Sequence, residues 1–376
     1  MAQKKELSQA RTYLKSGKDF DKAEKLMTGL ISKDSTQRSN KRVLETWFET
    51  VEKQYEVANE KLYLKQKQDT AAFFSLISRM FVVAEALDSA EMQPDNKGRV
   101  QPASRQHNRE KLLELRPNLF QAGLFFMKKD KFEEAFSYFE QYIDCARQPL
   151  FAADSLATTD GKMAEAAYWS TTCAYRMHDA VRTLRYRDMA LGDTARAAFT
   201  YQYIAQARKW LGDDELYLKA VEQGFKVSPT SSYFFPRLMD AYTQKGNYPR
   251  ALETAEEALK ADSASILFLF AKSTVLLQMK RYAESIPVSK HIIALNDTLA
   301  EAYYNAGSAY LNMAINMNPR KEKKQQTQYF QDAKTHFERY RQMAPDEVKK
   351  WGPPLYQIYL NLNLGKEFDE LDRLMK

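Results

Sequence analysis

A repeat of 34 residues is the feature of this sequence that most constrains its fold. Ala251 and Ser285 lie 34 residues apart, in the similar segments Lys-Gly-Asn-Tyr-Pro-Arg-Ala-Leu and Lys-Arg-Tyr-Ala-Glu-Ser-Ile. Two further steps of the same length towards the N-terminus reach Tyr217 and then Thr183. A period of roughly 20–50 residues is typical of architectures in which one supersecondary unit cannot bury its apolar face alone. The sequence therefore predicts an array of units that are stabilised by stacking on their neighbours.

A turn-and-helix signature recurs outside this grid. It combines a short polar or glycine turn, an aromatic residue and, three residues later, a small or apolar residue. Segments 16–23, 129–135, 329–333 and 364–371 carry it wholly or in part. Such a turn ends one helix and begins its antiparallel partner, and the small residue lets the two helix backbones approach closely. Only 12 Gly and 12 Pro occur in 376 residues, which favours long helices over a turn-rich sandwich or barrel.

The spacing of bulky, small and aromatic residues resembles the tetratricopeptide repeat. One unit has the family's pattern at Leu119, Gly123, Phe126, Ala135, Phe139 and Tyr142. A second unit, in which Met239 replaces the small residue, has Phe235, Tyr242, Ala251, Ala255 and Ala258. A third, with 14 extra residues before Ala333, has Tyr303, Gly307, Tyr310, Ala333, Phe337, Tyr340 and Pro345. The units around Thr183 and Tyr217 match the 34-residue spacing better than the family's residue types. In the N-terminal third the family's pattern is degenerate.

This resemblance implies an all-α fold, a right-handed α-solenoid of about eight or nine stacked antiparallel hairpins. We expect degenerate hairpins over 1–90, a loop over 91–108, the repeat stack over 109–296 and C-terminal repeats with a capping hairpin over 297–376. A further loop is expected near 148–160. Pro249 should begin a helix, and Pro236 and Pro287 should lie in first turns, because an interior proline costs about 3 kcal/mol.

Several classes of protein are not expected. No run of eighteen apolar residues occurs, so we expect no transmembrane segment. The net charge is +7, but basic and acidic residues are interleaved, so no nucleic-acid partner is expected. Cys145 and Cys173 are expected in the core, and the four histidines lack ligand spacing, so neither a metal nor a cofactor is expected. Phosphate loops, zinc-protease motifs and nucleophile elbows are also missing, which argues against an enzyme.

The opening Met-Ala-Gln-Lys-Lys resembles a mature terminus behind an added start methionine. Many bacterial envelope proteins resemble it after their signal peptide has been removed. We therefore expect a periplasmic or cell-envelope location, with a cytoplasmic one as the alternative.

In the tetratricopeptide family the first helix of each hairpin lines a concave groove that binds peptides or partner helices. The resemblance implies that groove positions here are Tyr168, Trp169, Arg176, Gln202, Tyr203, Gln206, Arg237, Asp240 and Asn305. Trp169 and Tyr203 are the expected anchors, since aromatic rings supply contact area at low entropic cost; the alternative is that they only pack between helices.

The expected function is a non-catalytic protein-interaction scaffold, such as an accessory factor of a cell-envelope assembly. A glycan- or peptidoglycan-binding module is the alternative, because stacked aromatics flanked by amides also suit sugars. Trp169, Tyr203 and Trp210 motivate that alternative.

Overall fold

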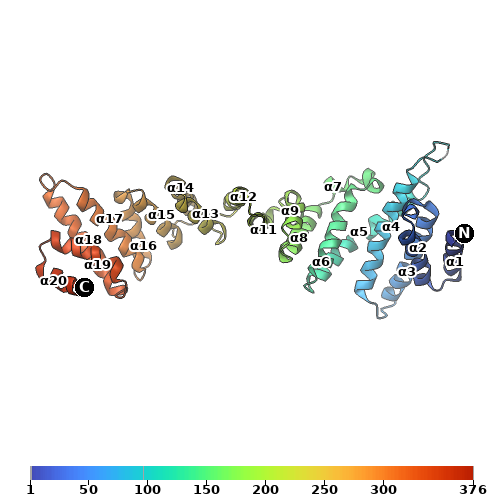
Figure 1. Ribbon diagram of the computed structural model, residues 1–376, viewed down its shortest axis with the longest axis horizontal. Coiled ribbons are helices and arrows are strands. Elements are labelled where there is room, and N and C mark those ends of the chain that lie inside the picture. The colour runs from blue at the N-terminus through green and yellow to red at the C-terminus, as the bar shows by residue number, and fades with distance from the viewer. Residues whose placement is uncertain (1, 96, 376) are drawn as a thin grey trace. The chain divides into compact units, whose positions relative to one another are not determined.

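A computed structural model describes residues 2–95 and 97–375, and all of the regular structure in these residues is helical. The predicted all-α class is confirmed. The chain forms two compact units, unit 1 (Met1–Tyr217) and unit 2 (Leu218–Lys376), and the division falls within one helix. Each unit is a stack of helix hairpins and is described by itself (Figure 1).

Unit 1 begins with hairpins of unequal length. Its helices are α1 (Ala2–Ser16), α2 (Phe20–Lys33), α3 (Lys41–Tyr63), α4 (Thr70–Glu91), α5 (Arg105–Met127) and α6 (Phe132–Asp144). They continue with α7 (Leu156–Thr159), α8 (Met163–Arg176), α9 (Ala180–Arg185), α10 (Arg187–Ala190) and α11 (Ala197–Trp210). Short 3-10 helices join some of them, namely η1 (Ser35–Ser39), η2 (Cys145–Arg147), η3 (Pro149–Asp154) and η4 (Thr194–Arg196).

Helix α12 (Asp214–Val227) carries the division between the units. Unit 2 continues with α13 (Phe234–Gln244), α14 (Tyr248–Ala261), α15 (Ile266–Gln278) and α16 (Tyr282–Leu295). Its last four helices are α17 (Ala300–Asn316), α18 (Lys323–Met343), α19 (Val348–Asn361) and α20 (Gly365–Met375). The 14 extra residues seen in the sequence therefore lengthen α17 and α18 around a short connection.

The 34-residue period is visible in the backbone itself. Helices α9, α12, α14 and α16 begin at residues 180, 214, 248 and 282, so the four phased residues of the sequence are each the fourth residue of a second helix. The turn before each of these helices contains one residue in the left-handed region, at Gly212 and Gly246 but also at His178 and Lys280. The turn geometry thus persists where glycine is replaced, although a non-glycine residue there carries strain.

Close approach of the paired helices rests on glycine at the predicted small position. A Cβ atom added at Gly123 on α5 would lie 2.6 Å from the ring of Phe139 on α6. The same relationship recurs between Gly307 on α17 and Phe337 on α18, at 2.9 Å. The small residue of the second helix is fully buried at Ala135 and Ala333, among others. The steric reading of the repeat pattern is confirmed at these positions.

Local differences from the expected elements have simple causes. The expected loop at 148–160 contains η3 and α7, because Leu150 and Phe151 are buried there and order the segment. As expected, Pro236 lies in the first turn of α13 and Pro249 in the first turn of α14. The expectation for Pro287 is wrong, because it is the sixth residue of α16. Both Pro287 and Ala283 are solvent-exposed, so water can satisfy the carbonyl group that loses its partner.

Helix α4 is long and apolar enough to cross a membrane by length and composition, although the sequence contains no continuous run of eighteen apolar residues. Its 22 residues meet the requirement by length and composition, and 44% of the apolar window is buried inside the protein. In unit 1 the helix packs against α3 and α5, and its last turns bury the acidic residues Asp88 and Glu91. This is the placement of a core helix.

Candidate functional site

The nine residues expected to line a groove all lie on first helices of hairpins. Unit 1 carries six of them, on α8 (Tyr168, Trp169 and Arg176) and on α11 (Gln202, Tyr203 and Gln206). Unit 2 carries the other three, on α13 (Arg237 and Asp240) and on α17 (Asn305). The two sets belong to different units, so each is considered on its own.

In unit 1 four rings form what we call the aromatic ladder, made of Tyr168, Tyr203, Tyr175 and Trp210. The ring centroids of Tyr168 and Tyr203 are 6.3 Å apart, and Tyr203 stacks on Tyr175 at 4.5 Å. Tyr175 in turn stacks on Trp210 at 5.5 Å. The rings alternate between α8 and α11, so the ladder ties the two first helices together along one face.

Exposure changes along the aromatic ladder. Tyr168 is only 6% exposed, whereas Tyr203, Tyr175 and Trp210 are half-buried. Burial, with a further contribution from Tyr168, raises the pKa of Tyr203 above its usual value. Its phenol is therefore neutral at physiological pH. Tyr168 is the buried end of the ladder. It was predicted as a groove residue, but a ligand could not contact it.

Trp169 lies beside Tyr168 and contacts two charged side chains, Glu165 and Arg196. Its ring is 4.9 Å from that of Tyr168, and its Nε1 donates to Glu165 Oε1 at 3.3 Å. The guanidinium carbon of Arg196 lies 5.4 Å from the ring centroids of both Tyr168 and Trp169. A hydrogen bond from Lys162 is the main cause that lowers the pKa of Glu165, which keeps this carboxylate charged. Trp169 is thus fixed in orientation while part of its surface remains exposed.

Unsatisfied polar groups accompany the ladder. Arg176 is exposed, and its guanidinium carbon lies 4.8 Å from the Phe132 ring. Within residues 2–95 and 97–375, no carboxylate lies within ion-pairing distance of Arg176. The amides of Gln202 and Gln206 are half-buried and make no hydrogen bond to any described residue. One cation and two amides are therefore available to a ligand beside the rings.

In unit 2 the expected residues do not form a comparable surface. Asn305 is only 5% exposed, and its Nδ2 donates to Ser273 Oγ and Thr274 Oγ1 at 3.3 and 3.1 Å. Its side chain belongs to a buried hydrogen-bond network. The prediction that Asn305 lines the groove is therefore wrong. Arg237 stacks on Tyr233 at 3.7 Å and donates to the Tyr233 carbonyl at 2.8 Å, and Asp240 is exposed.

Sequence reasoning missed Tyr175 and Arg196. The signal for Tyr175 was present, because Tyr168 and Tyr175 are seven residues apart, as are Tyr203 and Trp210. Residues seven apart share one face of a helix, so two such pairs on adjacent first helices indicate a ladder. Arg196 had no comparable signal, since it approaches Trp169 only through the fold of the connection before α11.

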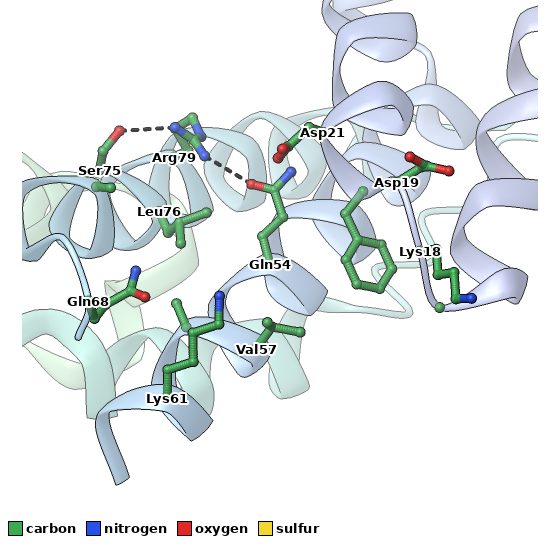
Figure 2. Close-up of a pocket in the computed structure, with 14 residues that line it drawn as sticks. Lys18, Asp19, Asp21, Gln54, Val57, Lys61, Gln68, Ser75, Leu76 and Arg79 are labelled. Atoms are coloured by element: carbon green, nitrogen blue, oxygen red, sulfur yellow. Dashed lines mark hydrogen bonds between the residues drawn. The ribbon is translucent and has the colours of Figure 1, made fainter. Parts of the chain in front are cut away.

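An open hollow lies elsewhere in unit 1, between the α1–α2 turn and helices α3 and α4 (Figure 2). Its volume is about 690 Å³. Arg79 at its edge donates to Ser75 Oγ at 3.0 Å and to Gln54 Oε1 at 3.1 Å, and it pairs with Glu24. Basic and acidic groups alternate around the hollow, and its arginine is already bound, so it shows no preference for a charged ligand.

No cluster of three or more His, Cys, Asp and Glu side chains suited to a metal occurs in the described part of the chain. Cys145 and Cys173 are free and buried, as predicted for core residues. Burial raises their pKa values to about 11 and about 12, so both thiols are protonated at neutral pH.

No known family model matches the sequence, and no curated protein matches it. Solved helical-repeat structures are similar at low identity. The C-terminal part of a TPR repeat-containing protein from Cytophaga hutchinsonii is 14% identical, with 67% of this chain and 92% of that chain covered and a TM-score of 0.41. MamA from Desulfovibrio magneticus is 20% identical over 49% of this chain and 97% of its own, with a TM-score of 0.38.

A TPR repeats protein from Bacteroides fragilis is 16% identical over 69% of this chain and 98% of that chain, with a TM-score of 0.31. At such identities the likeness concerns the fold alone. The protein's own features carry the assignment, namely the paired helices, their strict 34-residue phase and the glycine–phenylalanine contacts at the predicted positions. The chain is an all-α helical-repeat solenoid of stacked antiparallel hairpins, similar in fold to solved tetratricopeptide-repeat proteins.

Proposed function

We propose that this protein is a non-catalytic interaction scaffold, and that α8 and α11 of unit 1 bind an extended segment of a protein partner. The observation that supports this most directly is the aromatic ladder, together with the neighbouring Arg176, Gln202 and Gln206, whose side chains make no ion pair or hydrogen bond in the described chain. Trp169, Tyr203 and Trp210 each expose part of a ring. Their positions are fixed by ring contacts before any ligand arrives, so binding would order few side chains.

The polar groups suit a peptide in particular. An extended segment presents backbone carbonyls at regular intervals, which the amide NH2 groups of Gln202 and Gln206 can bind. Arg176 has no carboxylate partner in the described chain and would accept an acidic side chain of the segment. The favoured ligand is therefore a segment with apolar or aromatic residues next to an acidic one.

Site-specific photocrosslinking tests the proposal. A crosslinking amino acid at position 206 should trap a partner in the native source, and the same group at Asp240 of unit 2 should not. Binding of the trapped partner is then measured with the double variant Arg176→Ala and Gln206→Ala. These side chains make no hydrogen bond or ion pair in the described chain, so the fold should persist while affinity drops about tenfold or more. Unchanged affinity would contradict the proposal.

A second pair of variants separates binding from packing. Trp169→Ala together with Tyr203→Ala should weaken binding of the partner further and leave helical content near that of the wild type. Loss of helical content would mean that these rings act as core. The matched control is Arg237→Ala with Asp240→Ala, which removes two first-helix side chains from unit 2 and should leave affinity unchanged.

The glycan-binding alternative needs open ring faces. Tyr175 stacks on Tyr203 and on Trp210, His178 lies 5.2 Å from the Trp210 ring, and Arg196 lies 5.4 Å from the Trp169 ring. Sugar rings would have to stack on the parts of Trp169 and Trp210 that these neighbours leave exposed. Retention on isolated peptidoglycan, lost in Trp169→Ala, would support this alternative over the protein scaffold. A role in a cell-envelope assembly, rather than in the cytoplasm, stays a prediction that fractionation of the native cells would decide.

A further inference from the structure

The turn between α3 and α4 exposes apolar side chains in an unusual run. Residues 61–67, Lys-Leu-Tyr-Leu-Lys-Gln-Lys, are all exposed, and we call them the basic–apolar tip. Leu62, Tyr63 and Leu64 are 41%, 86% and 54% exposed. A single exposed leucine is ordinary on a protein surface, but three consecutive large apolar side chains at one turn indicate a contact with something apolar.

The exposure follows from the lengths of neighbouring hairpins. Helices α3 and α4 have 23 and 22 residues, whereas α1 and α2 have 15 and 14. The α1–α2 turn lies across the hollow from Gln54 and Arg79, and Lys61 lies two helical turns beyond Gln54 (Figure 2). At about 1.5 Å per residue, this places the tip roughly 10 Å further along α3. In Figure 1 the α3–α4 turn protrudes at the lower edge of unit 1.

The tip is also basic. Lys61, Lys65 and Lys67 make no ion pair with any residue of the described ranges, and no acidic residue occurs between 61 and 68. Asp69 follows, but its Oδ1 accepts hydrogen bonds from the backbone N–H groups of Ala71 and Ala72 and so caps α4. Glu60 precedes the tip and lines the neighbouring hollow near Lys111. The three lysines thus flank the apolar run in sequence and form no ion pair, while Tyr63 also lines a hollow with Glu56, Glu60 and Glu114.

We propose that the basic–apolar tip anchors this protein peripherally to a lipid bilayer that contains anionic headgroups. A convex turn cannot enclose a peptide, but it can enter a flat surface. The Leu62 and Leu64 side chains would enter the acyl boundary, Tyr63 would lie at the headgroup level where its ring and hydroxyl are both satisfied, and the lysines would reach the phosphates. Charge complementarity favours an anionic surface over a neutral one.

The anchor requires only the tip. Helix α4 begins at Thr70, directly after it, and remains packed on α3 and α5, so no helix has to leave the core. The contact lies on α3–α4, whereas the aromatic ladder lies on α8 and α11. Failure of the membrane proposal would therefore leave the protein-binding proposal untouched.

Vesicle co-sedimentation of the full chain tests this proposal. Vesicles of phosphatidylcholine alone are compared with vesicles containing 30% phosphatidylglycerol. We expect retention on the anionic vesicles that is lost at high salt. The triple variant Lys61→Gln, Lys65→Gln and Lys67→Gln should lower the partition coefficient about a hundredfold, from roughly fivefold per lysine. Leu62→Ser, Tyr63→Ser and Leu64→Ser together should lower it at least tenfold and leave the circular dichroism spectrum unchanged.

The α17–α18 connection supplies a matched control. Lys321, Lys323 and Lys324 are also exposed and basic, but no run of exposed apolar residues accompanies them. Their combined change to glutamine alters the net charge equally and should leave retention nearly unchanged. An equal loss in this control would assign binding to diffuse charge and overturn the proposal, as would an absence of vesicle binding. A blue-shifted difference spectrum of Tyr63→Trp on anionic vesicles would support insertion.

Discussion

The rings of Tyr175 on α8 and Tyr203 on α11 stack with their centroids 4.5 Å apart and their planes inclined by 30°. This contact lies at the centre of the aromatic ladder, because Tyr175 also stacks on Trp210 and Tyr203 also touches Tyr168. Two adjacent first helices are thereby held in register, and a surface made of separate hairpins acquires a fixed shape.

Removal of the central ring should loosen the ladder. Tyr175→Ala is expected to lower the free energy of unfolding by about 1–3 kcal/mol, through lost burial and two lost ring contacts. Tyr175→Phe keeps the ring and should cost less than 1 kcal/mol. Chemical denaturation measures both variants, and near-ultraviolet circular dichroism reports the environment of Trp210. Equal stability of the alanine variant and the wild type would show that the stack contributes nothing.

A buried carboxyl group on α4 should make stability depend on pH. Burial, with a smaller effect of Asp144, raises the pKa of Glu85 to about 7 from its ordinary value of 4.5. The folded state therefore holds a proton that the unfolded state releases, and this stabilising contribution is lost as pH rises from about 4.5 to about 7. The loss should be on the order of 1–3 kcal/mol.

Glu85→Gln removes this titration. The variant should match the wild type at pH 4.5 and be the more stable protein at pH 8, as measured by denaturant midpoints across this range. Glu60→Gln, at an exposed position on α3, serves as the control and should show no such crossover. A parallel pH dependence in wild type and Glu85→Gln would contradict the assignment.

The contact between Gly123 and Phe139 should make even a methyl group costly. An added Cβ would lie 2.6 Å from the ring, so Gly123→Ala must push α5 and α6 apart, at about 1–3 kcal/mol. Gly29, inside α2, has no neighbour within 4 Å of such an atom. Gly29→Ala should instead stabilise by about 0.5–1 kcal/mol through higher helix propensity. Thermal unfolding of the two variants should shift in opposite directions.

Arg116 on α5 should be a strong determinant of stability in unit 1. It pairs with Asp160 at 2.5 Å, donates to the Tyr142 carbonyl at 3.0 Å and lies 3.7 Å from the Tyr142 ring centroid. Burial opposes ionisation of Asp160, but hydrogen bonds from Tyr142 and Arg116 hold its pKa below the ordinary value. Arg116→Ala leaves that carboxylate without its cation, and a loss of about 2–4 kcal/mol is expected.

A double-mutant cycle checks this pair. Arg116→Met combined with Asp160→Asn removes both charges and should recover much of the loss, since no charge is left without its partner. Additive effects of the two single changes on the denaturation midpoint would show that the two side chains are energetically independent.

Periodic parts of the fold were predictable because they depend on local spacing. Starting positions of α9, α12, α14 and α16 follow the 34-residue grid even where Thr183 and Tyr217 replace the expected small residue. Gly123 and Gly307 were recognisable because only a residue without a side chain fits against the facing phenylalanine. Three of the four ladder rings were predictable, since Tyr168, Tyr203 and Trp210 were named but their partner Tyr175 was not.

By itself, the sequence determined the helical class, the hairpin phase and which helix comes first in each hairpin, because a repeat of turn, small and bulky residues specifies one way to pair two helices. Only the tertiary structure decided which side chains on those helices remain accessible. Tyr168 and Asn305 occupy groove positions in the pattern, yet neighbouring hairpins bury them, whereas unequal hairpin lengths expose Tyr63. Accessibility depends on what the adjacent unit covers, and that is a property of stacking and not of any one repeat.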